Sequence, residues 1–242
     1  MTEKIKDVKL FLFDMDGTLY LGNQIFDFTV ELLAQIKLQG KRYLFMTNNS
    51  SKSVTSYIEK LKNLGIDAVY DDFITSSQAT AHYLKNNYPN HRLYVCGTTS
   101  FQEELKQQGF VITNEPEKAE CIVMGYDTEL TYQKLIDISK MLCTRDIPYI
   151  ATNPDYVCPT EFGSVPDCGS FADMIYNATK KRPLVIGKPE PLMPQLAMQQ
   201  HGYTKEEIAV IGDRIYTDIA CGVAAGIHSL LVLSGESTME DV

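Results

Sequence analysis

The chain has 242 residues, of which 44% are hydrophobic and 22% are charged, a composition typical of a globular protein rather than a disordered or fibrous one. The 22 Lys and Arg against 31 Asp and Glu give a net charge of -9, which disfavours nucleic acid and anionic membranes as partners. No apolar run reaches the ~20 residues of a membrane helix, and the charged N-terminal segment does not resemble a signal peptide, so we expect a cytoplasmic protein.

Short apolar runs alternate with amphipathic stretches, a pattern that predicts parallel strands connected by helices. The first run, Val8–Phe13, predicts a strand buried on both faces. We expect Asp27 to cap the helix that follows it. A second strand is expected at Tyr43–Met46, and the next helix is expected to begin at Ser53 and to end at Gly65.

The alternation continues to the end of the chain. Further strands are expected at Leu93–Cys96, Cys121–Met124, Tyr149–Ala151, Leu184–Ile186, Ile208–Ile211 and Leu230–Leu233. Further helices are expected at Phe101–Gln108, Tyr132–Leu142, Pro191–His201 and Thr217–Ala225. Because no linker is rich in Gly, Pro or Ser, we expect any second domain to be inserted through short connections.

The six cysteines and four histidines indicate neither a disulfide framework nor a zinc site. The cysteines form no C-x-x-C pair, and none lies at zinc-ligand spacing from a histidine. We therefore interpret them as reduced and mostly buried small apolar side chains.

The strongest local signal is Asp14-Met15-Asp16-Gly17-Thr18, directly after the first predicted strand. Ligands of open α/β sheets bind beyond the carboxyl ends of the strands. Two carboxylates placed there favour a cation, and Mg²⁺ fits best because one or two carboxylates, water and a substrate phosphate complete its coordination. An EF-hand calcium loop is disfavoured, because Gly17 is the fourth residue counted from Asp14, whereas an EF-hand requires glycine in the sixth position. Taken alone, the pair of aspartates is equally typical of a helix cap or a solvated turn.

Three further polar clusters follow predicted strands. The strand at Ile208–Ile211 is followed by Asp213 and Asp218, although Asp218 alone is also typical of a helix N-terminus. The string Thr47-Asn48-Asn49-Ser50-Ser51 offers hydroxyl, amide and backbone N–H groups that suit a phosphate, and it also suits ordinary helix capping. Lys188 follows a strand as well, where a mobile surface lysine is the default interpretation.

In their order along the chain these four motifs resemble those of the haloacid dehalogenase superfamily phosphatases. Finer strings resemble the NagD-like, or 4-nitrophenyl phosphatase, branch: Asp14 to Gly22, Thr47 to Ser50, Thr152 to Asp155, and Gly187 to Pro191. The resemblance implies an α/β fold with a doubly wound parallel-sheet, Rossmann-like core and an inserted α/β cap domain of the C2 type. It implies a core of residues 1–77 and 183–242 and a cap of residues 78–182.

The chain departs from the branch in two places. Asp167-Cys168 stands before an expected Gly169-Ser170 turn where relatives carry small residues, so the resemblance does not define the shape and charge of the cap's substrate loop. The sequence also stops at Val242, soon after the last predicted strand, which would leave a sheet edge exposed.

The resemblance also implies a role for each motif residue. Asp14 would be the nucleophile, and Asp16 would protonate the leaving alcohol and then deprotonate water. Mg²⁺ would be held by Asp14, the backbone carbonyl of Asp16 and Asp213, with Asp218 as a direct or supporting ligand. The expected substrate-binding residues are Gly17, Thr47, Asn48, Asn49, Lys188, Asn153 and Asp155. For Asn153 and Asp155, an ordinary Asn-Pro-Asp turn is an equally good interpretation.

The sequence therefore predicts a Mg²⁺-dependent phosphatase that acts through an aspartyl-phosphate on a small-molecule phosphate ester, such as a sugar phosphate, a nucleoside monophosphate or an aryl phosphate. A phosphotransferase or mutase with the same chemistry stays open, as does a phosphometabolite-binding or signalling module without turnover. A D-x-D glycosyltransferase would leave Thr47 and Lys188 unexplained. The sequence is silent on oligomeric state, and a homodimer stays open.

Overall fold

The computed structural model describes residues 5–160 and 162–242, which form two compact units. The first unit takes the described residues of Met1–Thr47, Val54–Thr75 and Lys188–Val242, and the second takes those of Asn48–Ser53 and Ser76–Gly187. Residues 48–53 thus group with the second unit although they follow a strand of the first. That the second unit acts as a substrate cap remains a prediction.

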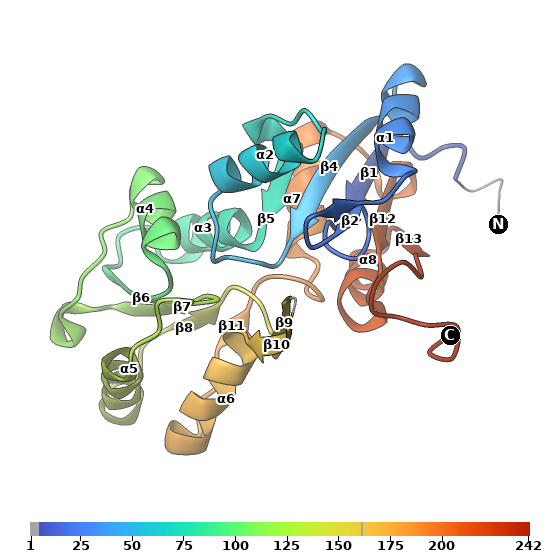
Figure 1. The fold of residues 1–242 in the computed structure, drawn as a ribbon. Helices are drawn as coiled ribbons and strands as arrows, with labels where there is room; N and C mark the ends of the chain where they lie inside the picture. The colour runs from blue at the N-terminus through green and yellow to red at the C-terminus, as the bar shows by residue number, and fades with distance from the viewer. Residues whose placement is uncertain (1–4, 161) are drawn as a thin grey trace. The chain divides into compact units, whose positions relative to one another are not determined.

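The first unit is built on a parallel sheet in the order β13-β12-β1-β4-β5. Its strands are β1 (Leu10–Phe13), β4 (Arg42–Thr47), β5 (Phe73–Thr75), β12 (Ile208–Gly212) and β13 (His228–Leu231). Its helices are α1 (Thr29–Leu38), α2 (Val54–Asn63), α7 (Leu192–His201) and α8 (Ala220–Ala225). Figure 1 shows the blue strand β1 beside the red strand β12, so the sheet joins segments from both ends of the chain.

The register of this sheet determines where the motif loops lie. Phe13 at the end of β1 pairs with Phe45 of β4 on one side and with Ile211 of β12 on the other. Because the strands are parallel, the loops after β1, β4 and β12 leave the sheet at the same edge. The central strand is buried, with Leu10 and Leu12 fully enclosed, as its apolar sequence predicts.

The second unit has a parallel sheet of its own, in the order β11-β8-β7-β6. Its strands are β6 (Leu93–Cys96), β7 (Cys121–Met124), β8 (Tyr149–Ala151) and β11 (Leu184–Val185). Its helices are α3 (Ser76–Asn87), α4 (Thr99–Gln107), α5 (Tyr132–Thr144) and α6 (Cys168–Thr179). In Figure 1, α3 and α4 cover one face of this sheet and α5 and α6 cover the other. An antiparallel hairpin of β9 (Val157–Thr160) and β10 (Gly163–Pro166) completes the unit.

The predicted α/β class with parallel sheets is confirmed, and the differences lie in local detail. The sequence did not predict the hairpin of β2 (Tyr20–Leu21) and β3 (Gln24–Ile25), β5, α3, α6 or the β9–β10 hairpin. Short strands and the polar sequence of α3 carry little periodic signal, whereas α6 does have an apolar face, formed by Phe171, Ala172 and Ile175. Short 3₁₀ turns lie at Tyr70–Asp72, Pro116–Lys118 and Lys205–Glu207.

Three local predictions were wrong. Asp27 does not cap α1, which begins after Phe28 without a side-chain cap and is anchored by the Thr29 hydroxyl donating to the Leu19 carbonyl. The Gly169-Ser170 segment is not a turn, because it lies in α6, whose first N–H is capped by the Asp167 carboxylate. The helix expected from Thr217 begins instead as a π-helical turn, Ile215–Ile219, that continues into α8.

Within the described residues, no helix combines the length and the apolar character needed to cross a membrane.

Candidate active site

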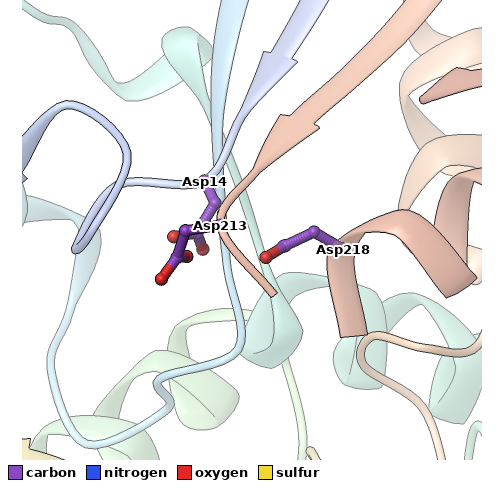
Figure 2. Close-up of side chains that lie close together, drawn as sticks. All are labelled: Asp14, Asp213 and Asp218. Carbon is purple, nitrogen blue, oxygen red and sulfur yellow. The ribbon is translucent and has the colours of Figure 1, made fainter. Parts of the chain in front are cut away.

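Three aspartates from two neighbouring strand ends gather at the edge of the first sheet. Asp14 follows β1, Asp213 follows β12, and Asp218 lies in the π-helical turn after β12. One carboxylate oxygen from each lies within 4.8 Å of the others. Figure 2 shows Asp14 and Asp213 together, with the Asp218 carboxylate directed toward them. Such a group of carboxylates needs positive charge to be stable when it is buried.

Lys188 supplies one positive charge within this group. Its side chain is buried, and its Nζ lies 2.6 Å from Oδ1 of Asp14 and 2.6 Å from Oδ1 of Asp218. It also donates to the carbonyl of Met46 at 3.3 Å. Burial by itself lowers the pKa of Lys188, but the two carboxylates outweigh it and hold the pKa well above its ordinary value. Lys188 is therefore a fixed ammonium group and not the mobile surface lysine of the default interpretation.

Asp14 lies in an environment that opposes its negative charge. Burial, together with the nearby carboxylates of Asp218 and Asp213, raises the pKa of Asp14 to about 7, although Lys188 acts in the opposite direction. One ammonium group thus does not fully compensate three acidic side chains. A second cation near Asp14 would favour its ionised form.

Asp213 provides the clearest test of whether a metal fits. Its Oδ1 is buried and has no hydrogen-bond partner among the described residues, whereas its Oδ2 accepts the backbone N–H of Glu236 at 2.7 Å. Burial raises the pKa of Asp213 above its ordinary value. A Cβ on Gly17 or Gly235 would collide with this carboxylate, so only glycine fits on either side of it. An unpartnered carboxylate oxygen beside two further aspartates fits a divalent cation with oxygen ligands.

Asp218 is used differently. Its Oδ1 accepts from Lys188, and its Oδ2 accepts the backbone N–H of Arg214 at 3.2 Å. A Cβ on Gly212 would collide with its side chain, so the carboxylate packs directly against the end of β12. Both of its oxygens therefore have protein partners, in contrast to those of Asp213.

The other predicted residues of the first unit lie on the same edge. Asp16 has an exposed carboxylate whose Oδ1 accepts the backbone N–H of Gly22 at 3.3 Å. Gly17 has a φ of +88°, a conformation that side chains rarely adopt. Thr47 is buried as the last residue of β4, which places it beside the loop that follows β1.

The remaining predicted site residues lie in the second unit. Asn48 and Asn153 both contact Asp155, whereas Asn49 makes separate contacts. Asp155 Oδ2 accepts the amides of Asn48 and Asn153, each at 3.0 Å, and the Asn153 amide also lies 3.2 Å from Asp167 Oδ1. Asn49 instead accepts the backbone N–H and hydroxyl of Ser51, which closes its own turn. These contacts fit both interpretations of the Asn-Pro-Asp segment, and a substrate role for these residues remains a prediction.

The segment from Ser234 to Ser237 also belongs to the site, although its residues were not predicted from the sequence. The Ser234 hydroxyl donates to the Gly17 carbonyl at 2.7 Å, the N–H of Glu236 holds Asp213 Oδ2, and the N–H of Ser237 donates to the Asp213 carbonyl. The sequence signal for this segment was Gly235 among polar residues, just after the last predicted strand. The other motifs also directly follow predicted strands.

Comparisons with known proteins identify the family to which the chain belongs. A family model described as haloacid dehalogenase-like hydrolase matches residues 11–111, and a related model of the same kind matches residues 185–242. An acid sugar phosphatase from Staphylococcus aureus is 35% identical over 98% of this chain and 91% of its own length.

Two solved structures share the fold along almost the whole chain. The 4-nitrophenylphosphatase from Thermotoga maritima is 38% identical with a TM-score of 0.94, covering 98% of this chain and 90% of its own. A protein described as a putative nagD protein is 39% identical with a TM-score of 0.93, covering 98% and 92%. The chain therefore belongs to the haloacid dehalogenase-like hydrolases, in the branch that contains NagD and 4-nitrophenylphosphatase.

Proposed function

We propose that the protein is a Mg²⁺-dependent phosphatase that hydrolyses small phosphate monoesters through an aspartyl-phosphate on Asp14. The observation that carries the proposal is the buried cluster in which Lys188 pairs with Asp14 and Asp218 while Asp213 keeps an unpartnered oxygen. Phosphoryl transfer of this kind requires a carboxylate nucleophile, a fixed cation and oxygen atoms that can bind a metal ion.

The first chemical step belongs to Asp14 and Asp16. A carboxylate oxygen of Asp14 attacks phosphorus, the bond from phosphorus to the leaving oxygen breaks, and protonated Asp16 gives its proton to that oxygen. In the second step Asp16 takes a proton from water as the water oxygen attacks phosphorus, and the bond between phosphorus and Asp14 breaks. The products are the alcohol and inorganic phosphate, and both aspartates return to their starting forms.

Lys188 and Thr47 serve the phosphoryl group in this scheme. Lys188 binds a phosphoryl oxygen and stabilises charge as it develops, and Thr47 donates a hydrogen bond from its hydroxyl. Asp14, Asp213 and the backbone carbonyl of Asp16 would hold Mg²⁺, which would supply electrostatic stabilisation of the phosphoryl oxygens. We assign Asp218 to the support of Lys188, because both of its oxygens have protein partners.

The size of the required rate acceleration indicates that Asp16 alone is not sufficient and that the cluster of Asp14, Lys188, Asp213 and Asp218 is needed as well. General acid–base catalysis by Asp16 contributes only ~10²–10⁴ in rate, whereas enzymes accelerate phosphate monoester hydrolysis by up to ~10²¹. Positioning and charge stabilisation must supply the rest. A chain with a net charge of -9 also needs local positive charge to admit a phosphate dianion.

The substrate class follows from the names of relatives together with the site. The relatives act, by name, on sugar phosphates and on 4-nitrophenyl phosphate, and the site described above recognises the phosphoryl group that both share. Sugar phosphates, nucleoside monophosphates and aryl phosphates are therefore the candidates to assay.

The test is phosphate release from a panel of these esters with Mg²⁺, comparing the native protein with Asp14→Asn. We expect turnover of at least one ester by the native protein and less than a few per cent of it in Asp14→Asn, whose side chain is nearly isosteric. Circular dichroism checks that the variant is folded. Turnover in Asp14→Asn at the native level would remove Asp14 from the nucleophilic role, and phosphate release that requires an added sugar acceptor would indicate a transferase.

A further inference from the structure

A lysine outside the four motifs lies against the exposed aspartate of the first motif. Lys60 is in the last turn of α2, and its Nζ lies 3.9 Å from Oδ2 of Asp16. The same Nζ lies over the ring of Tyr20, 4.1 Å from the ring centroid. Its side chain is 23% exposed, whereas that of Asp16 is 55% exposed, so the more enclosed partner is the cation.

Tyr20 provides a rigid base for this ammonium group. The ring is buried at the start of the β2–β3 hairpin, and the Tyr20 carbonyl accepts the N–H of Gly17 at 2.7 Å. The hairpin therefore fixes the ring relative to the loop that carries Asp16. A cation over an aromatic face is attracted by the electrons of the ring, which restricts where Nζ can lie.

The Asp16 carboxylate is approached from two sides. The N–H of Gly22 donates to Oδ1 at 3.3 Å, and Lys60 faces Oδ2. An exposed aspartate otherwise samples several staggered rotamers. The backbone donor and the ammonium group together favour one orientation of the carboxylate.

We propose that Lys60 is a positioning residue that holds the Asp16 carboxylate toward the leaving oxygen. The inference rests on the acid–base role proposed above for Asp16. A general acid must lie within hydrogen-bond reach of the atom that it protonates, and small misplacements have large effects on rate. Because an ion pair this exposed contributes little to stability, the effect of Lys60 is expected in the rate and not in the melting temperature.

The dependence on the leaving group distinguishes this role from a structural one. 4-Nitrophenolate is a stable anion that leaves without a proton, whereas phenolate is more basic and benefits more from a general acid. A variant that misplaces Asp16 therefore loses more activity on phenyl phosphate than on 4-nitrophenyl phosphate. A variant that merely loosens the fold loses activity on both alike.

The experiment measures kcat and KM for these two esters in Lys60→Met, Lys60→Arg and Lys62→Met. For Lys60→Met we expect kcat/KM, which reports the step that breaks the bond to the leaving oxygen, to fall roughly 10-fold on phenyl phosphate and less than about 3-fold on 4-nitrophenyl phosphate, since the variant impairs only part of a general-acid contribution. Lys60→Arg keeps the cation and is expected to restore most of the rate. Lys62→Met is the matched control, because Lys62 is an exposed lysine of the same helix.

A double variant tests whether Lys60 acts through Asp16. In the Asp16→Asn background, Lys60→Met is expected to change the residual kcat/KM on phenyl phosphate less than 2-fold, because the group that it positions has lost its acid function. Equal losses of kcat/KM on both esters or an additive double variant would each overturn the inference. Full activity of Asp16→Asn would instead contradict the proposed role of Asp16, so the two failures are distinguishable.

Discussion

Asp218 Oδ1 lies 2.6 Å from the Nζ of Lys188, and both side chains are almost completely buried. The same ammonium group contacts Asp14 at an equal distance, so Asp218 fixes the position from which Lys188 reaches the proposed nucleophile. A buried lysine with one acidic neighbour removed keeps its charge only at a cost in free energy.

We predict that Asp218→Asn lowers kcat by about 10–100-fold, the range observed when a group that orients a ligand or a cation is lost. The amide keeps the shape of the side chain but no longer compensates Lys188, which is then drawn toward Asp14. Steady-state kinetics on 4-nitrophenyl phosphate measures the effect. Glu117→Gln is the control, because Glu117 forms an exposed ion pair with Lys140. Native-level kcat in Asp218→Asn would show that Lys188 does not need this partner.

Gly235→Ala is expected to weaken metal binding and activity together. The added Cβ would collide with Oδ2 and Cγ of Asp213, so the whole carboxylate must shift, including the Oδ1 that has no partner among the described residues. We expect a loss of about 10-fold or more in Mg²⁺ affinity, measured from the Mg²⁺ dependence of activity. Gly40→Ala is the comparison, because its Cβ meets nothing within 4 Å and its positive φ affects only local backbone strain. An unchanged Mg²⁺ dependence in Gly235→Ala would exclude Asp213 as a ligand.

Removal of Mg²⁺ by a chelator is expected to abolish turnover and to leave the fold intact. Lys188 compensates part of the acidic cluster, and Asp14, whose pKa is raised to about 7, can bind a proton in place of the metal, so we expect the first unit to stay folded. Far-ultraviolet circular dichroism and an activity assay on the same sample check both statements. We expect Mg²⁺ to restore activity and Ca²⁺ to fail, because the larger ion relaxes the octahedral geometry. Equal rescue by Ca²⁺ would contradict that reasoning.

We predict that the buried side chain of Glu104 makes the free energy of unfolding of the second unit depend on pH. It is buried on α4, its Oε1 lacks a partner among the described residues, and burial raises its pKa from 4.5 to about 7. The folded state therefore binds a proton more tightly than the unfolded state, so the free energy of unfolding falls as the pH rises from about 4.5 to about 7.

Glu104→Gln removes this titration. We expect the variant to be more stable than the native protein at pH 8, by about 1–3 kcal/mol, and nearly equal to it at pH 4. Urea denaturation at the two pH values measures the difference. Glu103→Gln, at an exposed position of the same helix, is expected to change neither value by more than about 0.5 kcal/mol. The same difference in stability between Glu104→Gln and the native protein at both pH values would refute the prediction.

The sequence predicted the class of fold and the edge of the sheet where the chemistry lies. The near-continuous apolar run at Val8–Phe13 contains the buried strand β1 (Leu10–Phe13), and parallel strands bring the residues that follow them to one edge. Asp14 and Asp213 come from opposite ends of the chain, and their proximity follows from this rule and from the register of β1 with β12.

Other features depended on contacts that no local pattern encodes. Three such contacts join segments that are distant in sequence. They are the hydrogen bond from the Glu236 N–H to Asp213, the ion pair of Asp218 with Lys188, and the approach of Lys60 to Asp16. Apolar periodicity reports which face of an element is buried, but it does not report which side chain it meets. The sequence by itself therefore determined the fold class and the members of the acidic cluster, while only the tertiary structure decided which carboxylate oxygens are paired and which remain open to a cation.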